Sequence, residues 1–197
     1  MHSVLDGDEL PDNYPDIGFF EIDRIIFKEE YQYLGERELG SLSLSKSWYQ
    51  RNRAIYTVLM QEVCAVGYIN ILPVTAQCFE DLMDGTRTEG EIEPQEVLPF
   101  FDACTVHLYI AGLAILPDCR KNGTALRALL RKAVAKYSSL HQRGIVIGDL
   151  GAVAWSSEGE RFCEKLGLTR VQRDSRLGPA FRSSARPVRL ANWYAPR

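Results

Sequence analysis

The chain has 197 residues, 46% of them hydrophobic and 25% charged, which is typical of a folded domain and excludes collagen-like, coiled-coil and disordered chains. It contains no apolar run of the roughly 20 residues that a membrane span requires, and its acidic N-terminus lacks a secretory-signal pattern. Five widely spaced cysteines without a CxxC pair, and only three histidines, predict free thiols and no metal site. We therefore expect one cytoplasmic domain, with two small domains as the weaker alternative.

The first half of the chain is expected to contain an arm, short helices and a hairpin. Residues 1–18 are rich in Asp, Pro and Gly and predict an irregular arm. A strand is predicted over 19–27, with helices over 28–39 and 45–53, the second capped by Ser45 or Ser47. Apolar, β-branched runs over 55–61 and 64–74 predict a hairpin that Pro73 terminates. The segment 75–86 has helical spacing and ends at Gly85.

The second half alternates between strand and helix patterns. The most apolar run, 105–116, predicts a central buried strand, and 124–140 predicts a long helix with one apolar face. A strand over 145–155 and a short helix ending at Leu166-Gly167 follow. Two last strands are predicted over 168–173 and 187–194, around a polar loop. The expected fold class is α/β.

Charge is distributed unevenly along the sequence. Residues 1–100 hold 19 acidic and 7 basic side chains, whereas residues 101–197 hold 7 acidic and 16 basic ones. This asymmetry indicates separate surfaces for an anionic and a cationic ligand; the alternative is that the charges mix in space after folding. The connection 75–104 concentrates acids, and long connections in compact domains are often functional.

The turn at 120–125 carries the clearest chemical signal. It joins the buried strand to the long helix, and free N–H groups at a helix start bind anions, especially where a glycine such as Gly123 shapes the turn. The alternative is a plain β–α turn that needs a glycine. Neither GxxxxGK[ST] nor GxGxxG occurs, so we do not expect a P-loop nucleotidase or a dinucleotide-binding fold.

Two segments resemble one family. LAILPDCRKNGTALRALL is similar to the acetyl-CoA pyrophosphate motif [QR]-x-x-G-x-[GA] of the Gcn5-related N-acetyltransferases, with Arg120, Gly123 and Ala125 at the defined positions. GERFCEKLGL (159–168) resembles the A-x-x-F-Y-x-K-x-G-F segment of that family. The resemblance covers about 55–173 of a single domain, 1–197. The N-terminal 50 residues and the C-terminal segment 170–197 carry no matching motif.

The resemblance implies a mixed sheet flanked by helices, with a V-shaped splay between the fourth and fifth strands, here 105–116 and 145–155. It implies acetyl-CoA as co-substrate, with its pantetheine in the splay and its pyrophosphate on the amides of 121–126. Ser156 stands where an asparagine often contacts pantetheine. The implied cofactor-binding residues are Leu113, Ala114, Ile115, Arg120, Lys121, Asn122, Gly123, Thr124, Ala125, Leu126 and Ser156.

The catalytic residues implied by the resemblance depart from the usual family pattern. Cys163 replaces the tyrosine that can protonate the leaving thiolate, and Tyr109 stands where many members have a glutamate base. His107 lies two residues earlier, on the same strand face, and either it or Tyr109 could relay a proton through water. The alternatives are a buried thiol and a buried, hydrogen-bonded histidine.

The expected function is N-acetyl transfer from acetyl-CoA to a primary amine of a small molecule or protein, in a direct ternary complex. We expect the connection 75–104 to gate the acceptor pocket and Glu80, Asp81 or Glu96 to orient a cationic substrate. One alternative is a catalytically silent acyl-CoA-binding module. Another is an acetyltransferase acting on an RNA-linked amine, with the Arg-rich segment 170–197 contacting phosphates. A homodimer is left open.

Overall fold

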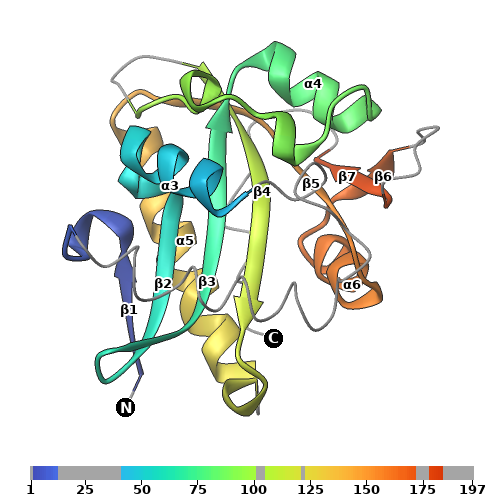
Figure 1. The fold of residues 1–197 in the computed structure, drawn as a ribbon. Helices are drawn as coiled ribbons and strands as arrows, with labels where there is room; N and C mark the ends of the chain where they lie inside the picture. Colours follow the sequence, from blue (N-terminus) through green and yellow to red (C-terminus); the bar gives the residue numbers. More distant parts are fainter. Residues whose placement is uncertain (1, 13–40, 101–104, 121–122, 172–177, 184–197) are drawn as a thin grey trace.

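The computed structural model describes residues 2–12, 41–100, 105–120, 123–171 and 178–183 (Figure 1). Its centre is a seven-stranded sheet with the order β1-β2-β3-β4-β5-β7-β6. The strands are β1 His2–Asp6, β2 Tyr56–Gln61, β3 Cys64–Val74, β4 Thr105–Ile115, β5 Val146–Val153, β6 Thr169–Val171 and β7 Ala180–Arg182. The sheet is mixed, because β4 and β5 are parallel and the other pairs are antiparallel. The predicted α/β class is therefore confirmed.

Helices cover both faces of this sheet. The α-helices are α3 Leu42–Arg51, α4 Ala76–Asp84, α5 Thr124–Gln142 and α6 Ser157–Lys165. Residues of α3 and α4 share one core cluster, and residues of α5 and α6 share another, so the two pairs lie on opposite faces (Figure 1). Short 3-10 helices occur at Gly7–Glu9, Arg53–Ile55, Glu89–Glu91, Pro94–Glu96 and Pro117–Cys119. No helix in the described part of the chain is long and apolar enough to cross a bilayer.

Strand β4 loses its pairing with β5 about halfway along β4. Their pairing runs from Thr105 opposite Val146 to Ile110 opposite Ala152, and the rest of β4 pairs only with β3 among the described residues. The β3–β4 register shifts at the same level: Ile71 is opposite Ile110, but Asn70 is opposite Gly112. Residue 111 is thus a bulge, and bulges bend a strand away from its neighbour. This geometry is the predicted splay between the fourth and fifth strands.

The sequence analysis was wrong at three points of the described chain. Residues 2–6 are not irregular but form β1, because the side chains of Val4 and Leu5 pack into different core clusters while the backbone pairs with β2. Ser41, not Ser45 or Ser47, caps α3, and its Oγ accepts from the N–H of Leu44 at 3.1 Å. β7 lies in the segment predicted to be a loop.

Other boundaries agree with the predictions or cannot be compared. β3 runs one residue past Pro73. The hairpin, β4, α4, α5, β5, α6 and β6 all occur within the predicted ranges or within two residues of them. The predicted strands at 19–27 and 187–194 and the helix at 28–39 lie outside the described residues.

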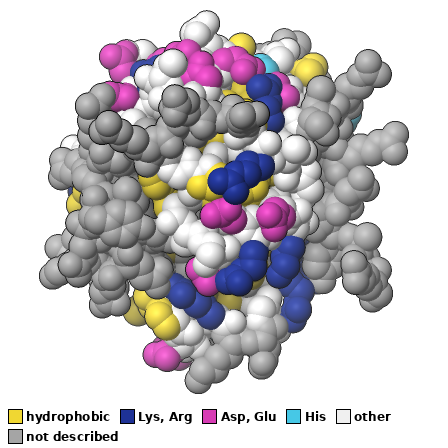
Figure 2. All heavy atoms as spheres, turned by 90° about the vertical axis from the view of Figure 1, so that its right-hand side faces the viewer, with side chains coloured by type: hydrophobic (Ala, Val, Ile, Leu, Met, Phe, Trp, Pro, Cys, Tyr) yellow, Lys and Arg dark blue, Asp and Glu magenta, His cyan; other side chains and the backbone are white. Residues whose placement is uncertain are grey.

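The charges of the two halves mix in space, as the alternative interpretation held. Glu80 pairs with Arg182 at 2.9 Å, and Lys132 lies 3.1 Å from Glu9 and 3.6 Å from Asp6. Figure 2 shows Lys and Arg side chains beside Asp and Glu side chains across the middle of one face, with further acids at the upper end over α4. On this face, the uneven distribution of charge along the sequence therefore does not produce one acidic and one basic surface.

Candidate functional site

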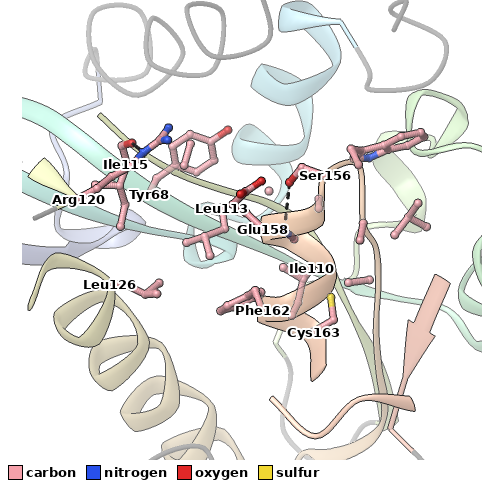
Figure 3. Close-up of a pocket in the computed structure, with 18 of the residues that line it drawn as sticks. Tyr68, Ile110, Leu113, Ile115, Arg120, Leu126, Ser156, Glu158, Phe162 and Cys163 are labelled. Atoms are coloured by element: carbon pink, nitrogen blue, oxygen red, sulfur yellow. Dashed lines mark hydrogen bonds between the residues drawn. The ribbon is translucent and has the colours of Figure 1, made fainter. Parts of the chain in front are cut away.

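A pocket of about 670 Å³ occupies the splay between β4 and β5. Its walls come from five places: Tyr68 of β3, the second half of β4, the turn and first residues of α5, the end of β5 with the residues after it, and the first turns of α6 (Figure 3). The lining residues are Tyr68, residues 110–115, Arg120, Gly123, Leu126, residues 152–156, Glu158, Gly159, Phe162 and Cys163. The pocket therefore brings together two segments that are more than thirty residues apart and that carry the two family-like motifs.

One end of the pocket is the start of α5. Gly123 is the N-cap residue, with φ 62° and ψ 10°, the left-handed conformation that glycine adopts without strain. A Cβ there would meet only Arg127 Nη1 at 3.9 Å, so the backbone angle rather than crowding requires glycine. Arg120 Nε donates to the carbonyl of Ile115 at 2.7 Å, which ties the turn to the end of β4. The N-terminus of a 19-residue helix at the pocket favours an anion.

The cofactor-binding residues implied by the resemblance divide into three groups. Leu113, Ala114, Ile115, Arg120, Gly123, Leu126 and Ser156 line the pocket. Ala125 is buried against Leu59 and Leu129 beneath the turn, and Thr124 is exposed at the helix start; neither is among the lining residues. Lys121 and Asn122 lie outside the described residues. The oxygen of Ser156 is engaged in capping α6, because it accepts from the N–H of Gly159 at 3.0 Å.

The side wall of the pocket offers backbone groups to an extended ligand. Beyond Ile110, the edge of β4 that faces β5 has no strand paired to it among the described residues. An unpaired strand edge presents N–H and C=O groups in a row, and an extended chain can bind to it by main-chain hydrogen bonds. The pocket therefore combines an anion-binding end with a wall suited to a linear amide-containing chain.

Cys163 lies on the α6 side of the pocket (Figure 3). Its side chain is buried, and burial raises the pKa of the Cys163 thiol to about 11. At neutral pH the group is therefore a thiol, which can donate a proton but is a weak nucleophile.

The structure places Tyr109 and His107 away from Cys163, on the α3–α4 face of β4. Tyr109 is buried in the core cluster of that face, and its hydroxyl donates to Glu89 Oε2 at 3.1 Å. His107 Nδ1 accepts from the N–H of Asp149 at 3.3 Å, and its ring packs on Phe79. His107 lies where β4 and β5 are still paired, and neither residue lines the pocket.

The acidic connection is packed into the fold and does not form an open flap. Cys78, Phe79, Leu82, Met83, Ile92 and Val97 are all at most 1% exposed. Trp48 Nε1 donates to the carbonyl of Ile92 at 3.0 Å, and Leu98 N–H donates to Pro73. These contacts indicate that the described part of the connection is fixed in the fold. Such packing does not favour the predicted role of this connection as a gate of the acceptor pocket.

The three acids proposed from the sequence to orient a cation have partners on the surface. Glu80 binds Arg182, Glu96 Oε1 accepts from Arg87 at 2.6 Å, and Asp81 accepts from Gln77 at 2.7 Å. The carboxylate that does point inward is Glu89. The sequence contains no signal that distinguishes Glu89 from the neighbouring acids, since its burial depends on the path of the whole connection.

The arginine-rich segment is described only in part. Arg170 lies 3.5 Å from Glu160, and Arg182 binds both Glu80 and Asp149. These two arginines are therefore engaged in ion pairs within the fold. Among all the described residues, no three His, Cys, Asp or Glu side chains are grouped in a way that could hold a metal ion.

No protein-family model and no curated protein sequence matches this chain. Solved structures do match it. An acetyltransferase of the GNAT family from Staphylococcus aureus Mu50 aligns with a TM-score of 0.58 and 10% identity, over 93% of this chain and 98% of that one. The PaiA N-acetyltransferase from Thermoplasma acidophilum, in complex with coenzyme A, gives 0.50 and 13%, over 93% and 98%.

A third match is to a chain of the NatC complex bound to Gag peptide and CoA, with a TM-score of 0.55 and 15% identity over 92% of this chain and 94% of that one. These identities are low, so the likeness concerns the path of the backbone. The agreement extends over almost the whole chain and includes the mixed sheet with its parallel β4–β5 pair. The chain therefore has the fold of the Gcn5-related N-acetyltransferases.

Proposed function

We propose that the protein is an N-acetyltransferase that transfers the acetyl group of acetyl-CoA to a primary amine. The observation that carries the proposal is the single pocket shared by the Gly123 turn and the unpaired edge of β4. The turn would hold the pyrophosphate through N–H groups and the helix dipole. The strand edge would bind the pantetheine amides, and the apolar side chains Leu113, Leu126 and Phe162 would exclude water from the thioester.

Two features of the pocket support the binding of an acyl-CoA: the conformation of Gly123 and the position of Cys163. The αL conformation of Gly123 leaves open space where a Cβ would be, so a phosphate can approach the backbone closely. A free amine would then attack the thioester carbon directly, and Cys163, which lines the pocket, would give its proton to the departing sulfur and take one from the amine nitrogen. The buried, neutral state of this thiol favours direct transfer over a covalent acyl-enzyme.

Calorimetry with acetyl-CoA tests the proposal. Gly123→Glu should raise the Kd by more than about 100-fold, because it places a negative charge at the anion-binding end. Gly167→Glu is the matched control, because Gly167 also has a positive φ and open space at its Cβ position but does not line the pocket. Its affinity should stay within a few-fold of the wild type. Absence of wild-type binding, or equal affinity for Gly123→Glu, would overturn the proposed function.

Thiol release in the presence of amines separates the enzyme from a silent acyl-CoA-binding module. An enzyme should release CoA only when an acceptor amine is present. A protein that binds acetyl-CoA but releases no thiol with any primary amine would be a binding module.

A further inference from the structure

Three polar side chains lie on the α3–α4 face of the splay, and two of them are joined by a hydrogen bond. The steps under the proposed function use none of the three. They are Asn70 of β3, Tyr109 of β4 and Glu89 of the connection, here called the polar triad. Asn70 alternates with Ile69 and Ile71, which face α5, so it points to the same side as Tyr68, Leu72 and Tyr109. In the β3–β4 ladder, Leu72 is opposite Tyr109 and Asn70 is opposite Gly112.

Asn70 has a buried acceptor that no described residue satisfies. The residue is 4% exposed, and its Oδ1 has no hydrogen-bond partner in the described structure. An unmet polar atom in such a place costs about 1–3 kcal/mol, so it calls for a ligand or water. Its cross-strand neighbour Gly112 and the preceding side chain on the same face, Tyr68, both line the pocket. Asn70 therefore lies directly behind the pocket wall at the bulge.

Glu89 is the only carboxylate among the described residues that is fully buried. The segment around it is held in place: Glu91 Oε2 accepts from the N–H of Thr88 at 2.9 Å, and Arg87 binds the carbonyl of Glu91 at 3.1 Å. Its Oε2 accepts the Tyr109 hydroxyl, which reaches it from the strand that carries the bulge. Glu89 can therefore exchange a proton with Tyr109 along this hydrogen bond.

We propose that the polar triad is the acceptor-amine site and that the acceptor is a compact primary ammonium. This inference rests on the proposed function, because the thioester must lie in the pocket on the other side of the bulge. Asn70 Oδ1 accepts one N–H of the ammonium, and the ring of Tyr68 offers a face to its positive charge. The close burial of all three groups selects an amine with an unbranched carbon beside the nitrogen.

The triad also provides a route for the proton. An N–H bond of the ammonium breaks and its proton passes to Tyr109 Oη, while the Tyr109 proton passes to Glu89 Oε2 along the existing 3.1 Å hydrogen bond. The freed lone pair forms the C–N bond at the thioester carbon, and the C–S bond breaks. Cys163 gives its proton to the departing sulfur and takes the second amine proton in return. Solvent later removes the proton from Glu89.

Steady-state kinetics with acetyl-CoA and spermidine or kanamycin, which carry primary amines on CH2 groups, test this inference. A peptide whose amino terminus is on a branched α-carbon should be a poor acceptor. Asn70→Leu should raise the KM for the amine at least about tenfold, because it removes the acceptor while keeping four side-chain heavy atoms with the same branching. The Asn70→Leu variant should keep or raise the Tm, because it also removes the buried Oδ1 that has no hydrogen-bond partner in the described structure. Glu89→Gln and Tyr109→Phe should each lower kcat about 10²-fold, and the double variant should be no worse than either.

Glu93→Gln is the matched control, because Glu93 is an exposed acid on the same connection. It should leave KM, kcat and Tm unchanged. All variants should bind acetyl-CoA with wild-type affinity, which keeps this inference separate from the proposed function. Normal amine kinetics in Asn70→Leu and Glu89→Gln would overturn the triad while leaving acetyl transfer intact.

Two other results would also overturn the inference. One is a parallel fall of Tm and activity in Asn70→Leu, which would mean that the side chain only supports the fold. The other is a wild-type protein that binds acetyl-CoA yet acetylates none of the primary amines.

Discussion

At the scale of the residue, Cys163 shows how environment decides chemistry. A free thiol in a pocket for a thioester could attack the acyl carbon, but burial keeps it protonated. Cys163→Ala should therefore lower turnover by no more than about 10²-fold, the effect of losing a proton donor. Mass spectrometry after incubation with acetyl-CoA alone should find no acetyl group on this residue. A kinetically competent adduct would contradict direct transfer, and an unchanged rate would remove Cys163 from the chemistry.

The residue scale also shows what periodicity can establish. Alternation along β4 correctly predicts that Tyr109 and His107 share one face. It does not tell which side of the sheet that face is on, and the structure places Cys163 on the other side. The importance of Asn70 was not predicted, because the state of a side-chain oxygen depends on neighbours from several elements.

At the scale of the element, Lys136 joins α5 to the first strands. The sequence places it off the apolar face of its helix, yet its side chain is only 9% exposed. Its Nζ donates to the carbonyls of Ala54 and Tyr56 at 2.8 and 3.1 Å and to Thr57 Oγ1 at 2.8 Å, and it lies 3.2 Å from Asp6. One lysine thus holds β1, β2 and α5 together.

We expect Lys136→Met to lower the free energy of unfolding by about 3 kcal/mol, because it leaves the Asp6 charge and several buried acceptors without their donor. Urea denaturation would measure the loss. Lys132→Met is the control: that lysine contacts Asp6 and Glu9 but is 32% exposed, so its removal should cost less than about 1 kcal/mol. Equal losses in the two variants would show that the buried hydrogen bonds of Lys136 contribute no more to the free energy of unfolding than the exposed ion pairs of Lys132.

Elements with a strong local pattern were predicted well, and those without one were not. The hairpin, β4 and α5 have long apolar runs or clear periodicity, and α6 has both a serine cap and a C-terminal glycine. The five-residue β1 and the three-residue β7 have neither, so they are strands only because a neighbouring edge is available for pairing.

At the scale of the whole molecule, buried thiols couple stability to alkaline pH. Burial raises the pKa of Cys78 to about 12 and that of Cys163 to about 11, whereas an unfolded thiol ionises near pH 9. The folded state therefore binds more protons than the unfolded state above that pH, and stability must fall as the pH rises. Below about pH 8 both states hold the protons, and the two thiols add no pH dependence.

Between pH 8 and pH 10 we expect each of these thiols to lower the free energy of unfolding by about 1 kcal/mol. Urea denaturation across that range would measure the fall, and Cys78→Ala should show a smaller one than the wild type. Identical slopes would mean that the Cys78 thiol ionises as readily in the folded protein. The wild-type protein, denatured without reductant, should give five titratable thiols, and the four cysteines in the described residues are free.

The sequence by itself determined the local features of this protein: the elements with clear periodicity, the glycine turn before α5 and the cap of α6. These depend on backbone angles and on the spacing of apolar residues within about twenty positions. Only the tertiary structure decided which residues meet at the splay. Burial of Glu89 and Lys136, the orphan oxygen of Asn70 and the separation of Cys163 from Tyr109 arise from contacts between distant segments, and no short-range pattern records such contacts.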